Sequence, residues 1–208
     1  MPLYPLQLNV RGRRCVIIGA GRVAARKAAG LTECRADVLV VAPQAGDGVR
    51  ALVGEGRVTW LPEAYRAAHL DGARLVFAAT DSAAVNAQVT RDAQAQGVLV
   101  CDAGDPDAGD FVSPAVVRRG ALTLTASTEG ASPTLAAVVR ERLERAFGPD
   151  WEPLTALVGR LRGVIQAAGD EDARRQAVQH IIDDETVRAL LAQGHITEAE
   201  ARAKECCS

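Results

Sequence analysis

Up to about residue 110, short apolar runs alternate with longer alanine-rich stretches. The apolar runs are almost continuous, which is typical of parallel strands that are covered on both faces. We expect five strands, over Arg14–Ile18, Val38–Ala42, Val58–Leu61, Leu75–Ala79 and Val98–Cys101. The stretches Arg22–Glu33 and Ala83–Gln96 are expected to be helices. This alternation predicts an α/β fold with a Rossmann-type, doubly wound parallel sheet.

The pattern changes after this region. Leu122, Leu124 and Ala126 alternate with polar residues, and a period of two is typical of a half-buried strand. A hairpin across Arg119-Gly120 is therefore expected. Ser132-Pro133 then predicts the start of a helix, with serine as its N-cap and proline in its first turn.

Three segments follow from these patterns. Residues 1–113 are expected to form a nucleotide-binding domain, 114–149 a small α/β dimerisation segment, and 150–208 a helical domain. A hairpin with one amphipathic helix cannot bury its apolar face alone. We therefore expect this segment to pack against a second copy in a homodimer.

Composition and charge narrow the class of protein. The 208 residues carry 24 basic and 26 acidic side chains, whereas a dedicated nucleic-acid binder is strongly basic. No apolar run approaches the ~20 residues that cross a bilayer, and no secretory signal opens the chain. Cys15 and Cys101 lie in apolar runs and are interpreted as buried thiols of a cytoplasmic protein. We expect neither nucleic-acid nor membrane partners.

One loop carries the signature of dinucleotide binding. Gly19-Ala20-Gly21-Arg22-Val23-Ala24 follows a predicted strand and opens a predicted helix, which is the context that G-x-G-x-x-G/A requires. Gly19 permits the tight turn and Gly21 lets a pyrophosphate approach the backbone at the helix N-terminus. The alternative is a glycine-rich turn that only packs.

The acidic residue that usually follows the second strand is absent. That strand ends Val41-Ala42-Pro43-Gln44, and Asp37 lies at the wrong end of it. On these residues alone the choice between NAD and NADP stays open.

At this point the sequence resembles a known family, the N-terminal module of siroheme synthase, which also occurs as stand-alone precorrin-2 dehydrogenases. The motifs in the family's order and spacing are Tyr4-Pro5-Leu6, Gly12-Arg13, Cys15–Ala24, Ala42-Pro43, Ala78-Ala79-Thr80-Asp81, Phe111-x-x-Pro114-Ala115 and Gly130-x-Ser132-Pro133. The resemblance covers about residues 3–147, and the tail matches only in length and character.

The resemblance implies an NAD-dependent oxidation of precorrin-2 to sirohydrochlorin, which in some members is followed by insertion of ferrous iron. It also implies a homodimer built through the segment after residue 113. The residues it places around NAD are Arg22, Val23, Pro43, Gln44, Thr80 and Asp81.

The family's catalytic acid follows the fifth strand, in a stretch like Asn-Val-Val-Asp-Asp-Pro. Aligned backward from Phe111 without a gap, this sequence has Gly104 at the acid's place. A shift by one residue puts Asp105 on the acid and Asp102 on the asparagine. We favour Asp105, with Asp102 as the alternative. From the residues alone, Asp-Ala-Gly and Asp-Pro equally describe a solvated turn.

A substrate with many carboxylates calls for cations and hydrogen-bond donors. The candidates beside the hairpin and the following helix are Arg118, Arg119, Arg140, Ser127, Thr128 and Ser132. Ser132 can equally be a simple helix cap. The three histidines, His69, His180 and His195, are interpreted as surface residues, and no resident metal is expected. Cys206-Cys207 is either a metal pair or a frayed terminus.

A second class of function is a sensor that binds NAD without turning over a substrate. The acidic loop after the fifth strand and the Gly130-x-Ser132-Pro133 motif favour the enzyme, because a sensor needs neither.

Overall fold

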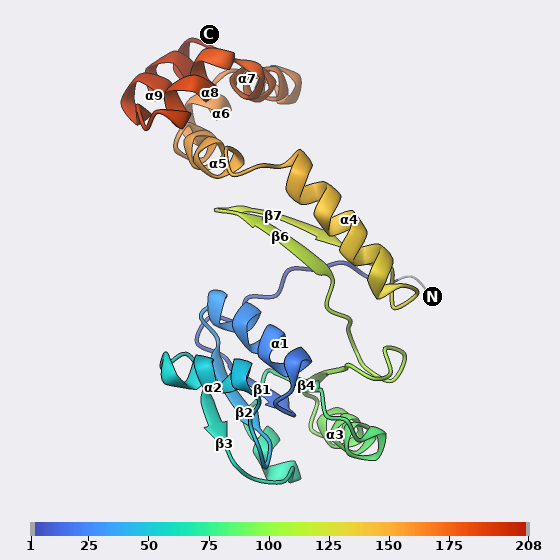
Figure 1. The fold of residues 1–208 in the computed structure, drawn as a ribbon. Helices are drawn as coiled ribbons and strands as arrows, with labels where there is room; N and C mark the ends of the chain where they lie inside the picture. Colours follow the sequence, from blue (N-terminus) through green and yellow to red (C-terminus); the bar gives the residue numbers. More distant parts are fainter. Residues whose placement is uncertain (1–2, 207–208) are drawn as a thin grey trace. The chain divides into compact units, whose positions relative to one another are not determined.

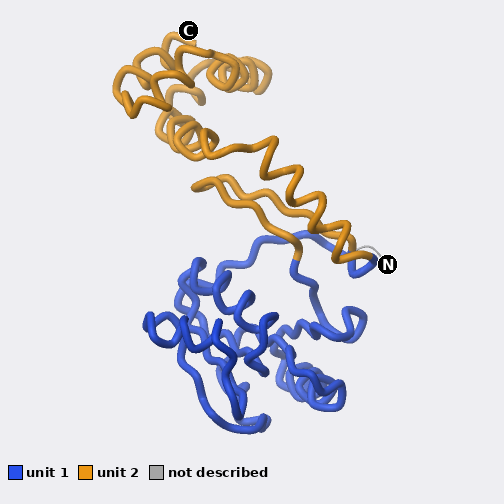
Figure 2. The backbone as a smooth tube through the Cα atoms, viewed as in Figure 1, with its two compact units in different colours: residues 1–113, 129–131 blue, residues 114–128, 132–208 orange. Residues whose placement is uncertain are grey.

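The structure, a computed structural model, describes residues 3–206. The chain forms two compact units (Figure 2). Unit 1 comprises residues 1–113 and 129–131, and unit 2 comprises residues 114–128 and 132–208. Cys207, one of the two terminal cysteines considered above, lies outside the described residues.

Unit 1 is built on a parallel sheet (Figure 1). Its strands are β1 (Arg14–Ile18), β2 (Asp37–Val41), β3 (Thr59–Leu61), β4 (Leu75–Ala78) and β5 (Leu99–Asp102). Within residues 3–206 they make one five-stranded sheet in the order β3-β2-β1-β4-β5. The expected strands are confirmed, each to within one residue at either end. The crossing from β3 to β4 places the topological switch point beside β1, where ligands of such sheets bind.

Helices cover both faces of this sheet, which confirms the doubly wound fold. They are α1 (Arg22–Glu33), α2 (Asp47–Gly54) and α3 (Ala83–Ala95), with a short 3₁₀ turn, η1 (Ala67–Leu70), before β4. Successive side chains of β1 enter different cores. Ile17 packs with Ala24 and Val49 beneath α1 and α2, whereas Ile18 packs with Val89 beneath α3.

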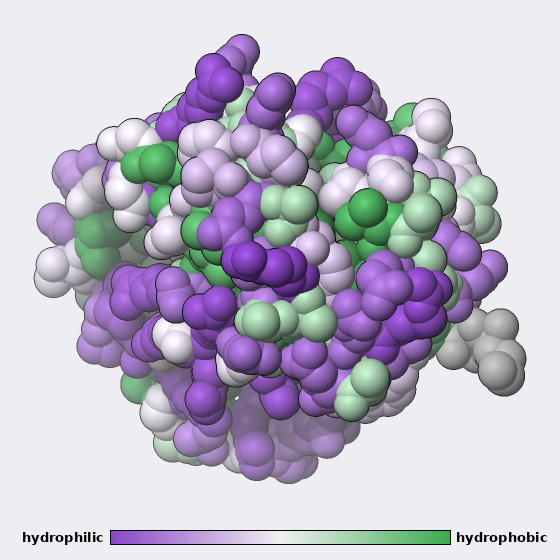
Figure 3. All heavy atoms as spheres, turned by 90° about the horizontal axis from the view of Figure 1, so that it is seen from below, coloured by the Kyte–Doolittle hydropathy of each residue, from purple (hydrophilic) through white to green (hydrophobic). Residues whose placement is uncertain are grey.

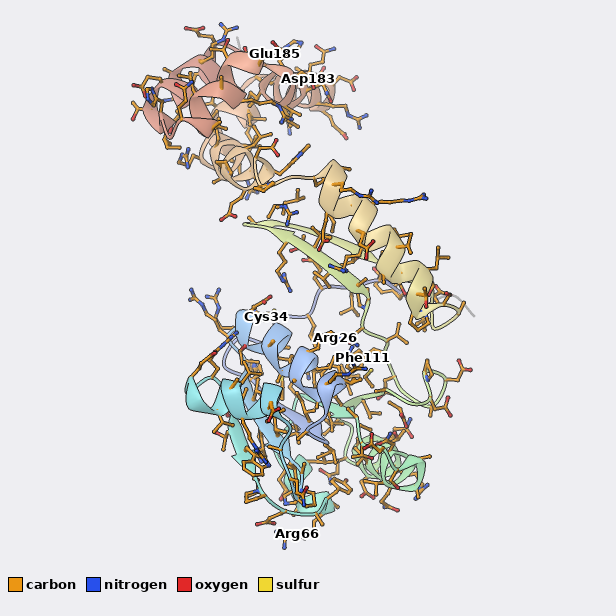
Figure 4. The ribbon with its side chains drawn as sticks, in the orientation of Figure 1. Arg26, Cys34, Arg66, Phe111, Asp183 and Glu185 are labelled. Atoms are coloured by element: carbon orange, nitrogen blue, oxygen red, sulfur yellow. The ribbon has the colours of Figure 1, made fainter. Side chains whose placement is uncertain are left out.

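The free edge of β5 is occupied by the chain that follows it. The Asp110 amide donates to the Val100 carbonyl at 2.7 Å, and the Val100 amide donates to Asp110 Oδ2 at 2.9 Å. Phe111, labelled in Figure 4, then packs edge-on against Phe77 with ring centroids 5.5 Å apart. The segment between Asp102 and Asp110 is therefore a loop anchored at both ends.

One sequence expectation about unit 1 is wrong. His69 is buried rather than exposed, with 7% of its surface accessible. Its Nδ1 accepts a hydrogen bond from the Arg66 amide at 3.1 Å, and its Nε2 lies 3.4 Å from Glu63 Oε2. The imidazole thus closes the η1 turn from inside. His180 and His195 are exposed, as expected.

Unit 2 begins with the expected hairpin and helix. The antiparallel strands β6 (Ala115–Arg119) and β7 (Leu122–Ala126) pack against α4 (Pro133–Ala146). Ser132 is the N-cap of α4, and its hydroxyl accepts a hydrogen bond from the Leu135 amide at 3.1 Å. The hairpin across Arg119-Gly120 and the helix start at Ser132-Pro133 are therefore confirmed.

The rest of unit 2 is helical. Its helices are α5 (Trp151–Arg160), α6 (Arg162–Ala167), α7 (Glu171–Asp183), α8 (Glu185–Ala192) and α9 (Ile196–Glu205). They share a core in which Leu157, Ile181 and Val187 are fully buried. Asp184 caps α8 and pairs with Arg202 of α9 at 2.8 Å.

The described surface is of mixed polarity. The face in Figure 3 shows small groups of hydrophobic residues between larger hydrophilic areas. Among residues 3–206, no helix is both long and apolar enough to cross a membrane. Large apolar side chains are exposed at Tyr4 and Leu6 near the N-terminus and at Leu135 and Val138 on α4.

Candidate functional site

The glycine-rich loop between β1 and α1 has the geometry of a phosphate-binding turn. Gly19 adopts φ +109°, and a Cβ there would lie 2.3 Å from the Ala79 carbonyl oxygen, so only glycine fits. Gly21 is different, because a Cβ there meets no atom within 4 Å. The backbone at Gly21 is thus open to a ligand.

The N-terminus of α1 is available to an anion. Its N-cap is Gly21, no side chain caps it, and its first turn carries no acidic residue. The first amides of a helix lack partners within the helix, and together with the helix dipole they favour a negative charge. By contrast, the Ser82 hydroxyl caps the start of α3 by accepting from the Val85 amide at 3.3 Å. The pyrophosphate of a dinucleotide therefore fits at α1.

A cavity of about 670 Å³ lies at the carboxyl ends of β1, β2, β3 and β4. Of the eight residues expected at the cofactor, six line it: Gly19, Gly21, Pro43, Gln44, Thr80 and Asp81. Arg22 and Val23 come directly after Gly21 and open α1, just outside this lining. The structure thus brings together residues that are up to 62 positions apart, from Gly19 to Asp81.

The loop after β4 is held by a buried side chain that was not among the expected site residues. Asn86 is 4% exposed, and its Oδ1 accepts from the Thr80 amide at 3.1 Å and from the Thr80 hydroxyl at 2.7 Å. Its Nδ2 donates to the Thr80 carbonyl at 3.2 Å. Thr80 is thereby fixed at the cavity wall.

The two candidate acids after β5 have different surroundings. Asp102 is 5% exposed, and its Oδ1 accepts from the amides of Gly104 at 2.8 Å and Asp105 at 3.1 Å. The Thr90 hydroxyl lies 3.5 Å from its Oδ2. Asp105 is exposed, and its Oδ1 accepts only from the Asp107 amide in the contacts described, at 3.2 Å. Asp102 therefore shapes the turn that presents Asp105.

Few charges face the cavity. Among the described residues that line it, Asp81 is the one carboxylate, and neither lysine nor arginine is present. Tyr65 also lines the cavity, and its hydroxyl donates to Asp92 Oδ2 at 2.9 Å. Burial, reinforced by the bond to Asp92, raises the pKa of Tyr65 well above its ordinary value of 10.0. Tyr65 thus stays neutral and protonated.

Two thiols of unit 1, those of Cys15 and Cys101, are structural. Cys15 is fully buried on β1, and burial raises the pKa of its thiol to about 11. Cys101 is buried on β5, and burial likewise raises the pKa of its thiol. A raised pKa keeps both as unreactive thiols at neutral pH.

The expected substrate residues lie in unit 2, where hydrogen bonds organise the turn before α4. The Thr128 hydroxyl donates to the Ser132 carbonyl at 3.0 Å and accepts from the Ser132 amide at 3.1 Å. The Arg118 guanidinium donates to the Thr123 hydroxyl at 3.2 Å across the hairpin. Ser127 directly precedes this turn. No group of three or more His, Cys, Asp or Glu side chains suited to a metal ion occurs within residues 3–206.

Comparison with known families identifies two regions. Residues 6–115 match the family described as "Putative NAD(P)-binding". Residues 119–146 match the family described as "Sirohaem biosynthesis protein central". The two matches follow one another along the chain and agree with the sequence resemblance stated above.

Curated relatives extend the similarity. The siroheme synthase of Chromobacterium violaceum is 36% identical over 205 residues, which is 98% of this chain and 43% of that protein. The siroheme synthase of Gluconacetobacter diazotrophicus is 37% identical over 180 residues, covering 84% of this chain and 38% of that protein. The chain thus spans about two fifths of these relatives. The expectation that similarity ends near residue 147 is wrong, because the first alignment includes most of the helical tail.

A solved structure described as "SirC, precorrin-2 dehydrogenase" has the same fold. The TM-score is 0.72, with 24% sequence identity, and the match covers 98% of this chain and 100% of that one. It confirms the predicted succession of Rossmann sheet, small antiparallel segment and helical tail.

Proposed function

Because the chain belongs to the NAD(P)-binding family and carries the sirohaem-biosynthesis segment directly after it, we propose that it is an NAD-dependent precorrin-2 dehydrogenase. The product is sirohydrochlorin, an intermediate of siroheme biosynthesis. The observation that carries the proposal is the open glycine loop at the switch point, in the same unit as an acidic loop after β5. The names of the siroheme synthases and of the structural neighbour support this substrate.

The cofactor fits the residues present. The free amides at the start of α1 would hold the pyrophosphate, and the space over Gly21 admits it. A 2′-phosphate, by contrast, finds neither lysine nor arginine among the described lining residues, which supports NAD over NADP. When bound, NAD supplies the acceptor for a hydride. The side chains of the acidic loop that follows β5 act on the other participant, the substrate.

The oxidation removes a hydride and a proton from the macrocycle. We assign the proton to Asp105, because its carboxylate is exposed and its backbone amide donates to Asp102, which holds this turn in shape. Asp102 is instead a positioning residue, since it is buried and its Oδ1 already accepts two backbone hydrogen bonds. For the substrate carboxylates we retain Arg118, Ser127, Thr128 and Ser132 as proposed contacts.

The proposed assembly is a homodimer formed through residues 114–149. No residue of α4 is buried, and two of its large apolar side chains are exposed, Leu135 to 53% and Val138 to 42%. An amphipathic helix with an uncovered apolar face is expected to find a partner, here a second copy. Buried free thiols at Cys15 and Cys101 support a reducing compartment, and we propose the cytoplasm.

The test is an anaerobic assay with precorrin-2 and NAD that follows NADH and the tetrapyrrole spectrum. Wild type is expected to form both products, and Asp105→Asn to lose about 10²–10⁴-fold in rate. The same mixture then receives ferrous iron, so that siroheme formation is read in one experiment. NAD binding without any turnover would overturn the proposal that the chain is an enzyme and would favour the alternative, a sensor that binds NAD. Retention of the rate in Asp105→Asn, with loss in Asp102→Asn, would reverse the two roles.

A further inference from the structure

The acidic loop after β5 contains a tight turn around Pro106. The Asp105 carbonyl accepts a hydrogen bond from the Ala108 amide at 3.2 Å, which closes a β-turn with Pro106 at its second position. Proline is favoured there because its ring fixes φ, and it also restricts the preceding residue to extended backbone. The direction in which the chain presents Asp105 therefore depends on where the ring of Pro106 lies.

The ring of Pro106 packs against Gly130. A Cβ on Gly130 would lie 3.2 Å from Pro106 Cβ and 3.4 Å from its Cγ, so a side chain there would push the ring away. Gly130 also has φ +88°, a left-handed backbone that residues other than glycine rarely adopt. Both residues belong to unit 1, in which residues 129–131 join residues 1–113 (Figure 2).

The turn that carries Gly130 is held by its own hydrogen bonds. Glu129, directly before it, has φ +53°, which is uncommon for a residue with a side chain. Its Oε1 accepts a hydrogen bond from the Leu3 amide at 3.1 Å. The Thr128 hydroxyl accepts from the Ser132 amide at 3.1 Å and donates to the Ser132 carbonyl at 3.0 Å. One side chain thus closes the turn around both left-handed residues, and the turn is a preformed support.

We propose that Gly130 is a positioning residue for the oxidation, because its lack of a side chain lets Pro106 rest against residues 129–131 and so sets the direction of the Asp105 carboxylate. This inference rests on the proposed function, since it needs Asp105 to accept the proton of the substrate. Asp102 holds the same loop from the strand side, through the Asp105 amide at 3.1 Å. A proton acceptor must lie within hydrogen-bond reach of the proton, and a misplacement of about 1 Å can lower a rate about 10²-fold.

The test changes the support and leaves Asp105 in place. In Gly130→Ala the new methyl group displaces the ring of Pro106, and kcat for precorrin-2 oxidation at saturating NAD is expected to fall about tenfold. The dissociation constant for NAD is expected to stay as in wild type, because no residue of this turn is among the described residues that line the cofactor cavity. Gly56→Ala is the matched control, since Gly56 has φ +68° and a Cβ there meets no atom within 4 Å. It is expected to keep the wild-type kcat.

Two double variants show whether the effect passes through Pro106 and Asp105. Pro106→Ala removes the ring and is expected to lower kcat by itself, so that adding Gly130→Ala lowers kcat less than it does in the wild-type background. In Asp105→Asn the acceptor is lost, and adding Gly130→Ala is expected to leave the residual kcat unchanged. A merely structural loss would lower the rate in every background. Pro106→Ala also provides the test if Gly130→Ala does not fold, because it removes the same contact from the other side.

A second measurement does not need turnover. Hydrogen exchange followed by mass spectrometry reads the amides of residues 104–108, which donate to Asp102 and Asp105 within the acidic loop. These amides are expected to exchange faster in Gly130→Ala and as in wild type in Gly56→Ala.

Three results would overturn the proposal. One is an unchanged kcat in Gly130→Ala, and another is unchanged exchange of the acidic loop in that variant. The third is an equal fold-loss from Gly130→Ala in the wild-type and Asp105→Asn backgrounds, which would mean that the effect does not pass through the carboxylate. Absence of turnover by the wild-type protein would instead overturn the proposed function, and the exchange measurement would still decide whether Gly130 supports the loop.

Discussion

Alanine is expected to have different effects at the two loop glycines. Gly19→Ala is expected to lower the stability of the fold, and Gly21→Ala to weaken NAD binding. In Gly19→Ala, the new Cβ would lie 2.3 Å from the Ala79 oxygen and 2.6 Å from its carbonyl carbon, both backbone atoms. The backbone at φ +109° is also strained for any L-residue. Strain of this kind costs about 1–3 kcal/mol. Forced overpacking costs about 1–3 kcal/mol more.

The sum, about 2–6 kcal/mol, is a large part of the 5–15 kcal/mol that stabilises a typical domain. With a urea dependence of about 1–3 kcal/mol per molar, a loss of 3 kcal/mol lowers the unfolding midpoint by roughly 1–3 M. Gly21→Ala is the matched variant, because its Cβ meets no atom within 4 Å and its φ is −79°. It is expected to unfold like wild type but to bind NAD at least about tenfold more weakly, since the methyl group occupies the approach of the pyrophosphate.

Urea unfolding followed by circular dichroism measures the first effect, and calorimetry with NAD measures the second. Gly19→Ala with the wild-type midpoint would refute the close approach of the two loops. Undiminished NAD binding by Gly21→Ala would refute the placement of the pyrophosphate.

Three further predictions concern other parts of the chain. Asp102→Ala is expected to lose about 1–3 kcal/mol in the free energy of unfolding, since the amides of Gly104 and Asp105 lose their buried acceptor, and Asp102→Asn is expected to lose less. Urea titration would contradict this if both variants unfold like wild type. Leu135→Glu is expected to shift a homodimer to monomer in sedimentation at micromolar concentration, and an unchanged mass would exclude α4 from the interface. The Val187 amide and Arg202 hold the pKa of Asp184 below its ordinary 3.8, so its stabilisation of unit 2 is present above about pH 4 and is lost as the pH falls through the lower folded value. Asp184→Ala should therefore reduce the helical signal at pH 7 far more than at pH 2, and an equal effect at both would contradict the assignment.

Most of the fold could be predicted because its signals are local. The bounds of Arg22–Glu33 follow from the glycine loop before the helix, and the start of α4 follows from Ser132-Pro133. The carboxyl-end cavity follows from the order of strands and helices, which fixes where Pro43 and Thr80 meet. These features need only neighbouring residues and general rules of chain topology.

What the sequence could not show depends on contacts between distant residues. Asp102 and Asp105 look alike in a turn-forming stretch, and only the burial of Asp102 and its two accepted amides separate their roles. The bond between Tyr65 and Asp92 joins residues 27 positions apart, with no spacing that would indicate it. The burial of His69 has no signal in the sequence, because a short 3₁₀ turn has no apolar periodicity that would indicate it.

The acidic loop leaves β5 at Asp102 and is tied back to the same strand through Asp110 and Val100. Its ends are therefore fixed by folding, and a substrate that binds there does not have to close the loop itself. The amide hydrogens of Val100 and Asp110 should exchange slowly with solvent, alongside those of the central sheet. The same closure occupies the amide and carbonyl of Val100, which β5 would otherwise offer to a further strand, so it hinders pairing of this edge with other chains.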